Sequence, residues 1–331
     1  MEEPPEKQKF GLLKCPFALR EEVIRNMEFM DAFHFSTLSK RSKQLVRNAR
    51  YQTFRITFCF EEKSSKDNIE MEIKKGERLK ISLSDLNVPP KRGSSSLDGL
   101  KLANLINEPS DDYRKKLSAH LLFIFHFKEI SVQIGRNIKH VEDLFLWSIT
   151  KQFDTVGLMA QKKLHITPDY LQFVLNATNA KEYFLDFRMN DLNFKYQLKD
   201  CESLDVSGSI QCLDTDGILQ RNPKMKELHL EELPGEQIND LLKQWINGEV
   251  NDLEVLAFFN WDGYSNEVIL DGIVTMKTKL TEEQARRMFG LWDASSRAVD
   301  IQRKIDGQLA AVHINQSGCF VSMCNKLLAE L

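Results

Sequence analysis

The sequence has little that would place the protein in a membrane or export it. Its longest apolar run, from Leu121 to Phe127, is interrupted by His126. A membrane-spanning helix would need roughly 20 apolar residues. The first residues, MEEPPEKQK, are acidic and contain proline, whereas a signal peptide is basic and then apolar. We therefore expect a protein of the cytoplasm or the nucleus with no membrane partner.

Neither sign of charge dominates the chain. The net charge is −3 over 331 residues, so the sequence carries no broad electrostatic signal for nucleic acid. Residues 36–55 do hold six Lys and Arg residues and no acid, which indicates a solvated helix face or a small basic patch. With 42% hydrophobic and 28% charged residues, the composition is typical of a globular protein and excludes a disordered one.

The sequence also lacks the features of a metal or catalytic centre. No Cys-x-x-Cys, phosphate-binding glycine loop, HExxH or GxSxG occurs. Reduced, buried thiols explain the six cysteines better than zinc sites at Cys201 and Cys212 or at Cys319 and Cys324. The histidines are scattered, which favours structural roles. We expect no metal, no cofactor and no catalytic site, and an unrecognised α/β enzyme is the least favoured alternative.

Residues 10–50 are the most informative part of the chain, because their pattern predicts three short helices. Pro16 suits the start of the first helix, Asp31 is placed to cap the second, and Ser39 is placed to cap the third. About forty residues cannot bury so much apolar surface among themselves, so part of it should face a partner. The apolar positions on the helix faces are Leu19, Val23, Ile24, Met27, Phe33, Phe35, Leu38, Leu45, Val46 and Ala49.

This segment resembles an F-box, in its Phe-x-Leu-Leu-x-x-Pro form with a trailing Leu-Ser-Lys-Arg-Ser-Lys. The segment departs from the family at Cys15, where Leu is usual, and at Phe29, where Pro is frequent. Each departure keeps an apolar side chain. The alternative is an ordinary three-helix start to a globular domain. The matching residues are Phe10, Leu12, Leu13, Pro16, Val23, Ile24, Met27, Phe33, Phe35, Leu38 and the run Ser39–Lys43.

The resemblance implies that the segment docks on a Skp1-like adaptor, which links it to a cullin–RING ubiquitin ligase. The chain would then be a non-catalytic subunit that recruits a protein substrate, which the sequence does not name. We expect the departures at Cys15 and Phe29 to weaken docking. A binding scaffold that acts outside a ligase is the alternative. The residues expected to bind Skp1 are Leu12, Pro16, Ile24, Met27, Phe33 and Leu38.

Residues 51–128 predict a β-hairpin, a loop and a connecting helix. Residues 54–58 and 69–73 alternate between apolar and polar side chains, which is typical of paired strands. Residues 84–98 are rich in Pro, Gly and Ser and predict an exposed loop. A helix is expected to begin at residues 109–112 and to end at about Phe125.

From residue 129 to 280, predicted strands alternate with predicted helices. The strands recur at uneven steps of about 19 to 27 residues, near the range of leucine-rich repeats. One helical face is expected at Ile138, Val141 and Phe145, and another helix at Thr167–Asp169. Stacked units of this kind would bury a continuous core and leave a strand-lined face. The expected strands are centred on Val132, Leu158, Leu185, Val206, Leu230 and Val255.

The predicted fold class is therefore α/β, or α+β overall. Three F-box helices would precede a leucine-rich-repeat-like solenoid, and a C-terminal β-hairpin would cap its open edge. A non-repetitive α/β domain with a mostly parallel sheet is the alternative. The expected domains are a flexible tail (1–9), the F-box (10–50), a hairpin, loop and helix (51–128), the repeat region (129–280) and a C-terminal helix and hairpin (281–331).

Within the repeat region, residues 203–273 resemble the F-box-associated domain of the second type. This resemblance implies a substrate-holding role, but it identifies no contact residue. We interpret Leu241, Leu242 and Trp245 as the core face of a helix and place Asn239 and Lys243 at its surface. The residues that carry the resemblance are 228–230, 238–245, 253–256 and 268–273.

Residues 281–331 predict a helix followed by a small antiparallel sheet. Thr281–Gln284 forms a capping-box pattern, and Ala285, Met288, Phe289 and Trp292 would line the helix that follows. Residues 299–305 and 309–313 alternate on either side of Asp306-Gly307, which is a strong hairpin signal. Residues 320–323 are expected to add a third strand.

Overall fold

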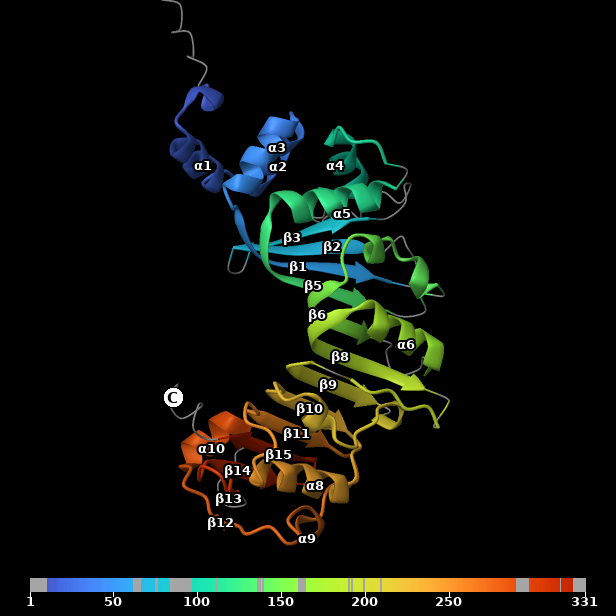
Figure 1. Ribbon diagram of the computed structural model, residues 1–331, viewed down its shortest axis with the longest axis vertical. Helices are drawn as coiled ribbons and strands as arrows, with labels where there is room; N and C mark the ends of the chain where they lie inside the picture. Colours follow the sequence, from blue (N-terminus) through green and yellow to red (C-terminus); the bar gives the residue numbers. More distant parts are fainter. Residues whose placement is uncertain are drawn as a thin grey trace, which may run out of the picture. The chain divides into compact units, whose positions relative to one another are not determined.

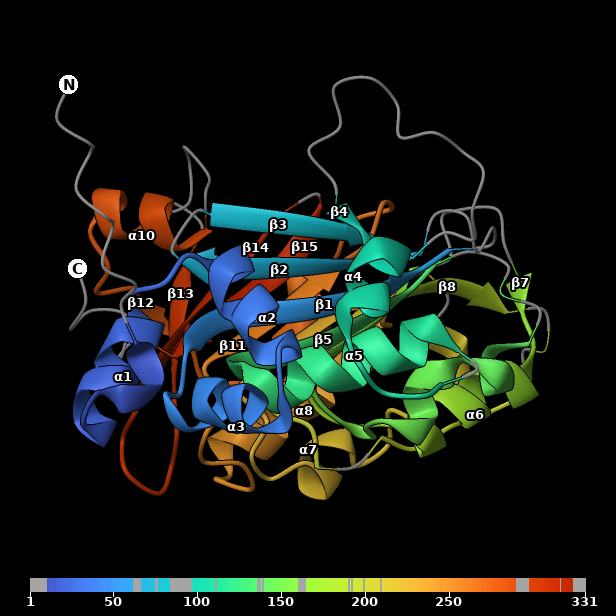
Figure 2. The same cartoon turned by 90° about the horizontal axis from the view of Figure 1, so that it is seen from above.

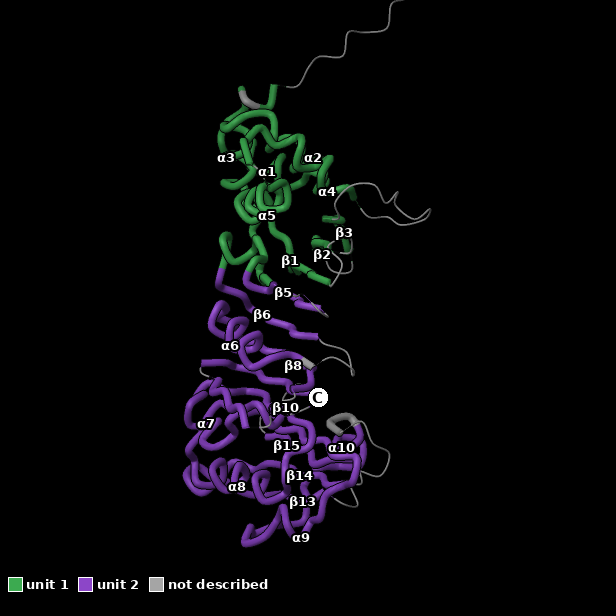
Figure 3. The backbone as a smooth tube through the Cα atoms, turned by 90° about the vertical axis from the view of Figure 1, so that its right-hand side faces the viewer, with its two compact units in different colours: residues 1–131, 143–150 green, residues 132–142, 151–331 purple. Residues whose placement is uncertain are grey.

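The computed structural model describes residues 11–61, 67–74, 77–83, 97–110, 112–135, 138, 140–159, 165–189, 191, 193–198, 200–208, 210–289, 298–315 and 317–323. The chain divides into two compact units (Figure 3). Unit 1 holds residues 1–131 and 143–150, and unit 2 holds residues 132–142 and 151–331. The predicted tail, residues 84–96 of the predicted loop and Trp292 lie outside the described residues.

Unit 1 combines helices with a small sheet. Its helical segments are η1 (Leu12–Lys14), α1 (Phe17–Arg25), α2 (Phe29–Thr37), α3 (Lys40–Asn48), α4 (Gly99–Leu105), α5 (Tyr113–Ile124) and the 3₁₀ turn η4 (Phe145–Ser148). Its strands are β1 (Gln52–Phe60), β2 (Asn68–Lys74), β3 (Glu77–Ser82), β4 (Leu97–Asp98) and the first part of β5 (His126–Ile134).

The sheet of unit 1 confirms the predicted hairpin. Strands β1 and β2 pair antiparallel, with Ile56 opposite Met71 and Phe58 opposite Ile69, and all four side chains are buried. Strand β3 continues the antiparallel order, and β4 pairs parallel with β3. The sequence pattern did not predict β3 or α4. Figure 2 shows α5 alongside these strands and close to α3.

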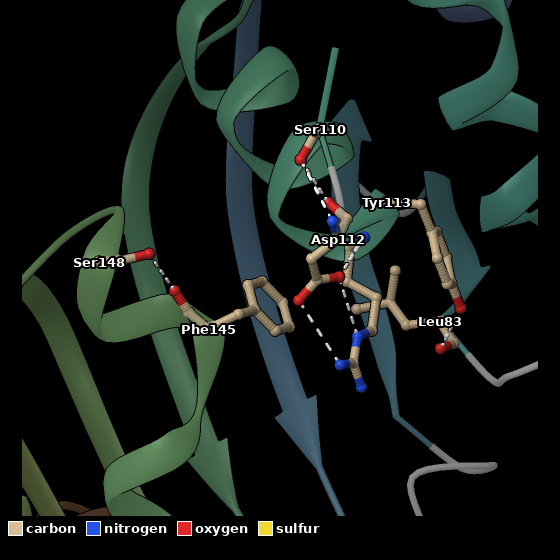
Figure 4. Close-up of polar contacts among 7 residues, drawn as sticks. Leu83, Ser110, Asp112, Tyr113, Phe145 and Ser148 are labelled. Carbon is tan, nitrogen blue, oxygen red and sulfur yellow. Dashed lines mark hydrogen bonds and ion pairs between the residues drawn. The ribbon is translucent and has the colours of Figure 1, made fainter.

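The start of α5 is fixed by polar contacts (Figure 4). The Asp112 carboxylate caps the helix, because it accepts from the Arg114 backbone N–H at 2.9 Å and from Arg114 Nε at 3.2 Å. The Tyr113 hydroxyl donates to the Leu83 carbonyl at 2.5 Å. The Arg114 guanidinium lies 5.7 Å from the centroid of the Phe145 ring. The predicted helix start near Asp112 is confirmed.

Unit 2 is built on parallel strands joined by helices (Figure 1). Strands β6, β8, β9, β10 and β11 pair parallel in that order, and the short β7 pairs with β8. The strand registers place buried side chains next to one another across the sheet. One such row consists of Tyr183, Leu204, Leu228 and Leu256. The bounds are β6 (Gln152–Met159), β7 (His165–Ile166), α6 (Pro168–Ala177), β8 (Asn179–Met189), β9 (Ser203–Gly208), η5 (Ile210–Cys212), α7 (Ile218–Arg221), β10 (Glu227–Glu231), α8 (Gly235–Ile246), β11 (Val255–Phe259) and α9 (Asn266–Ile269).

An antiparallel group completes unit 2. It consists of β12 (Met276–Lys277), β13 (Val299–Gln302), β14 (Leu309–Ile314) and β15 (Gly318–Met323). Strand β15 also pairs antiparallel with β11, so it covers the edge that the parallel strands would leave open. Figure 3 shows α6, α7 and α8 on one side of the strands and α10 (Glu282–Phe289) on the other.

Several expectations about unit 2 are confirmed in detail. The side chain of Thr167 accepts from the Tyr170 backbone N–H and so caps α6. Thr281 and Gln284 form the predicted capping box at the start of α10. Trp245 is fully buried on α8. The strands fall where the pattern placed them, whereas their relation to leucine-rich repeats, a solenoid and a hairpin cap stays a prediction.

Three local predictions are wrong. Residues 141–148 form the 3₁₀ segments η3 (Val141–Asp143) and η4 instead of a helix. Helix α2 begins at Phe29, so Asp31 lies in its first turn and does not cap it. Asn239 is buried, because its side-chain amide donates to the Ile269 carbonyl at 2.7 Å and to the Asp271 carbonyl at 2.9 Å. Periodicity alone could not show that a chain segment thirty residues away needs these donors.

The five described cysteines are thiols, and Cys201, Cys212 and Cys319 are buried. Burial raises the pKa of each of these three to about 12, which leaves them protonated and unreactive near neutral pH. Within the described ranges, no helix is long and apolar enough to cross a membrane.

Candidate partner-docking site

The helices α1, α2 and α3 form a cassette with its own internal order. Ser39 is the N-cap of α3: its hydroxyl accepts from the Ser42 backbone N–H at 3.0 Å, and the Ser42 hydroxyl accepts from the Ser39 N–H at 2.9 Å. This reciprocal pair confirms the predicted cap. Arg25 Nε donates to the Ala49 carbonyl at 2.8 Å and ties the end of α1 to the end of α3.

Two of the predicted docking residues belong to the interior of unit 1. Ile24 and Phe33 are fully buried in the chain by itself. They hold the helices together, and a partner could touch them only if the cassette opened. Ala32, Leu45, Val46 and Ala49 are buried as well.

Helix α5 of the same chain and the residue after it, Phe125, pack against part of the cassette. Phe29 stacks on Phe125 with the ring centroids 4.5 Å apart, and Tyr51 meets Phe125 edge-on at 5.4 Å. This contact explains why an aromatic residue stands at position 29. The Ser36 hydroxyl lies 2.8 Å from His120 Nε2, and the His120 ring meets Phe33 edge-on at 5.5 Å.

The contact between α3 and α5 is also charged. Lys43 Nζ and the Arg47 guanidinium lie 4.7 Å and 4.3 Å from the centroid of the Phe123 ring. Lys43 also pairs with Glu108 at 2.5 Å, and this hydrogen bond lowers the pKa of the Glu108 carboxyl. Burial, and then the charge of Lys43, lowers the pKa of His120 to about 4, so His120 is neutral at physiological pH.

The remaining predicted docking residues stay accessible to a partner. Leu38, after the last turn of α2, is 74% exposed, which makes it the most accessible of them. Pro16 is exposed, and Leu12 and Met27 are half-buried. The structure therefore places Leu12 and Pro16 before α1, Met27 after it, and Leu38 after α2.

Exposed residues outside the predicted set extend this surface. Phe17 and Leu19 on α1 are 52% and 48% exposed. Leu19 and the half-buried Val23 lie four residues apart, so they share one face of α1. The sequence pattern grouped Leu19 with the apolar face, but it could not show that this part of the face stays open.

A polar hollow lies between α1 and α3. It encloses about 500 Å³ and is lined by Phe17, Glu21, Arg25, Arg47, Asn48 and Arg50. Glu21 pairs with Arg25 at 3.3 Å. Three guanidinium groups against one carboxylate give the hollow a positive charge, suited to an acidic group of a partner. Two of these arginines, Arg47 and Arg50, belong to the basic run over residues 36–55, which the sequence pattern left open between a solvated helix face and a small basic patch.

The accessible apolar side chains of the cassette suit contact with a protein. In the part of the chain that the structure describes, no group of three or more His, Cys, Asp or Glu side chains could hold a metal ion. Among its accessible groups are the apolar side chain of Leu38 and the guanidinium groups of the polar hollow, alongside exposed carboxylates such as Glu22. Such a surface binds by burial and charge pairing.

Comparison with known proteins agrees with this description. Residues 12–51 match the F-box domain family. No curated protein and no solved structure matches the chain. The matched residues contain the cassette helices, from the start of η1 to Tyr51, which lies between α3 and β1. Residues 12–51 of this chain are therefore an F-box domain.

Proposed function

We propose that this protein is the substrate-recognition subunit of a Skp1–cullin–F-box ubiquitin ligase, acting in the cytoplasm or the nucleus. The observation that carries the proposal is the F-box match over residues 12–51. F-box domains bind Skp1 in cullin–RING ligases. The exposed Leu38, Phe17 and Leu19 support such a contact, because they leave apolar surface open on the matched helices.

In this role the protein does no chemistry itself. The F-box would hold the chain on the adaptor, and unit 2 would hold a protein substrate. Keeping two reactants together on one assembly raises their effective concentration, and proximity supplies the rate of ubiquitin transfer. The proposal requires no cofactor, no nucleic acid and no membrane.

We assign the substrate-holding role to residues 203–273, as an F-box-associated domain of the second type. The residues that carry this resemblance overlap strands β10 and β11 and helix α8, and strand β9 lies within the same range. Trp245 and Asn239, which belong to the residues that carry the resemblance, are both buried. Their burial supports a structural role for these two side chains. Substrate contact would then fall to other side chains of this region.

The enzyme alternative gains little support from the hollow beyond β11. This hollow encloses about 1050 Å³ and holds two carboxylates, Asp262 and Glu267, with no His, Cys or Lys among its described lining residues. Tyr264 has its pKa raised by burial, and its hydroxyl donates to the Leu233 carbonyl at 3.0 Å. Tyr264 therefore fixes the loop and is not placed as an acid or base.

Co-purification with a cullin distinguishes a ligase subunit from a scaffold. The full chain is expressed with Skp1, a cullin and its RING protein, and the chain is captured through a tag. We expect all three proteins in the eluate in equal amounts. Recovery of Skp1 without the cullin would favour a scaffold outside a ligase, and recovery of neither would contradict the proposal.

A further inference from the structure

A small hollow in unit 2 joins three segments that are distant in sequence. It encloses about 390 Å³ and lies between the end of α8, residues 272–276 and the end of β13. This volume falls within the range of about 300 to 1,000 Å³ that is usual for ligand pockets. The sequence pattern gave no sign of a pocket, although residues 238–245 and 268–273, which carry the family resemblance, supply part of its lining.

Hydrogen bonds hold these three segments in place. The buried Asn239 amide donates to the Ile269 and Asp271 carbonyls and so ties the segment before residue 272 to α8. The Lys304 backbone N–H donates to the Ile246 carbonyl at 2.8 Å and ties the end of β13 to the last turn of α8. The hollow is therefore formed before any ligand arrives, which reduces the entropy cost of binding.

Two further contacts fix the same region. The Arg303 guanidinium lies 5.6 Å from the centroid of the Trp245 ring and donates to the Val250 carbonyl at 3.2 Å. Strand β12 pairs with β13, with Met276 opposite Asp300. Met276 is thus held at the hollow by a strand pairing.

Part of the lining of the hollow is apolar. Val274 is 82% exposed and Met276 is also exposed. Exposed apolar side chains grouped around a cavity mark a binding surface more often than scattered ones do. The apolar lining residues are Ile246, Ile273, Val274 and Met276.

The charged groups at the hollow are cations. Lys243 and Lys304 line it, and no acid is found among the described lining residues. Lys304 Nζ donates to Asn247 Oδ1 at 2.9 Å, a neutral partner that leaves its charge uncompensated. The α8 dipole places about half a negative charge at this helix end, and two ammonium groups more than offset it. The site therefore favours a ligand that carries a carboxylate.

We propose that this hollow binds a peptide segment that presents a large apolar side chain next to a carboxylate. The apolar side chain would fill the space beside Val274 and Met276, and the carboxylate would meet Lys243 and Lys304. The carboxylate can belong to an acidic side chain or to a chain terminus. The proposal depends on the proposed function only where this peptide is taken to be part of a ligase substrate.

Methyl NMR on the full chain tests the proposal with defined peptides. The probes are N-acetyl-Leu-Glu-Glu-amide, the matched peptides with Lys in place of Glu or Ser in place of Leu, and N-acetyl-Gly-Gly-Leu with a free or an amidated terminus. We expect the first peptide to shift the Met276 and Ile246 methyl signals and the Lys and Ser peptides to leave them unchanged. If N-acetyl-Gly-Gly-Leu shifts these signals with a free terminus but not with an amidated one, the pocket also accepts the carboxylate of a chain terminus.

Charge-neutral variants complete the test. The double variant Lys243→Gln and Lys304→Gln should weaken binding of the acidic peptide at least about tenfold, since it removes both charge partners. The control variant Lys195→Gln and Lys224→Gln, at exposed positions elsewhere in unit 2, should bind as the original does. An unchanged methyl fingerprint outside the hollow confirms the fold. The proposal fails if neither carboxylate peptide shifts these methyl signals, or if the Lys243 and Lys304 variant binds equally well.

These results stand apart from adaptor binding. The peptides are measured on the chain alone, without Skp1 present. A chain that binds Skp1 but not the peptides would overturn the proposed pocket and leave the proposed function intact. A chain that binds the peptides but not Skp1 would overturn the proposed function and leave the proposed pocket intact.

Discussion

At the scale of single residues, His120 links the F-box to the helix that supports it. Its pKa is lowered to about 4, while an unfolded histidine titrates near 6.5. Between these values the unfolded chain binds a proton that the folded chain does not. The free energy of unfolding should therefore fall as the pH drops from 6.5 towards 4, by up to about 1.4 kcal/mol per pH unit.

The variant His120→Gln isolates this effect. It keeps a polar group near Ser36 and removes the titration. We expect the stability advantage of the original chain over the variant to shrink as the pH falls from 7.5 to 5, when both are unfolded in urea. A difference in stability that does not change with pH would show that His120 binds a proton equally well in the folded and the unfolded chain, which would contradict a lowered pKa.

Asn239 is the residue whose role the sequence pattern missed. It was placed on the surface of α8, but its amide serves the carbonyls of Ile269 and Asp271. The variant Asn239→Ala leaves one buried and one partly buried carbonyl without their donor and should cost about 2 kcal/mol of the free energy of unfolding. Urea unfolding measures this loss. The control is Asp240→Ala at the neighbouring exposed residue, which should change the free energy of unfolding by less than about 0.5 kcal/mol. Equal losses in the two variants would contradict the role given to Asn239.

At the scale of elements, the F-box helices depend on α5 for their core. Phe125, at the end of α5, stacks on Phe29 and meets Tyr51. The variant Phe125→Ala should destabilise unit 1 by about 3 to 4 kcal/mol, as is usual for a buried aromatic residue.

Limited proteolysis followed by mass spectrometry measures the loss of stability separately for unit 1 and unit 2, from the rate at which each is cleaved. We expect faster cleavage within residues 12–125 of the Phe125→Ala variant and unchanged cleavage within residues 151–323. The matched variant Phe54→Ala removes a partly exposed aromatic residue of the same unit and should have a smaller effect. Equal protection of the F-box in both variants would contradict the role given to the Phe125 contact in the core of the cassette. Until that is measured, docking experiments should use the full chain.

The sequence predicted those elements whose signals are local. Ser39 caps α3, Thr167 caps α6, and the alternation around Ile56 and Met71 gives a hairpin. The predictions failed where distant contacts decide. Residues 141–148 form 3₁₀ turns, although their apolar spacing fits a helix. Strand β3 is an exception, because Leu79, Ile81 and Leu83 alternate with polar residues and so carried a local signal that the prediction overlooked.

For the candidate site, the sequence pattern predicted which segment forms the cassette, but it did not predict which of its side chains are exposed. It identified the F-box residues, and the family match covers the same segment. It could not separate Ile24 and Phe33, which are buried, from Leu38, which is exposed. The burial of Phe33 depends in part on His120 of α5, a contact between residues that are far apart in the sequence.

At the scale of the whole molecule, the division of labour between the units is the central claim. Unit 1 contains the F-box with its supporting helix and sheet, and unit 2 contains the parallel strands and the pocket at α8. A change on the exposed surface of the F-box should therefore affect adaptor binding alone. Leu38 is suited to this test because its exposure allows substitution without loss of a buried contact.

Binding of the full chain to purified Skp1 by isothermal titration calorimetry tests this claim most directly. We predict a stable complex, weakened at least about tenfold by Leu38→Asp, because a charge would replace an apolar contact. The matched variant Trp261→Asp changes an exposed apolar residue of unit 2, 86% exposed, and should bind as the original does. No binding by the full chain, or equal binding by the Leu38→Asp variant, would contradict the account.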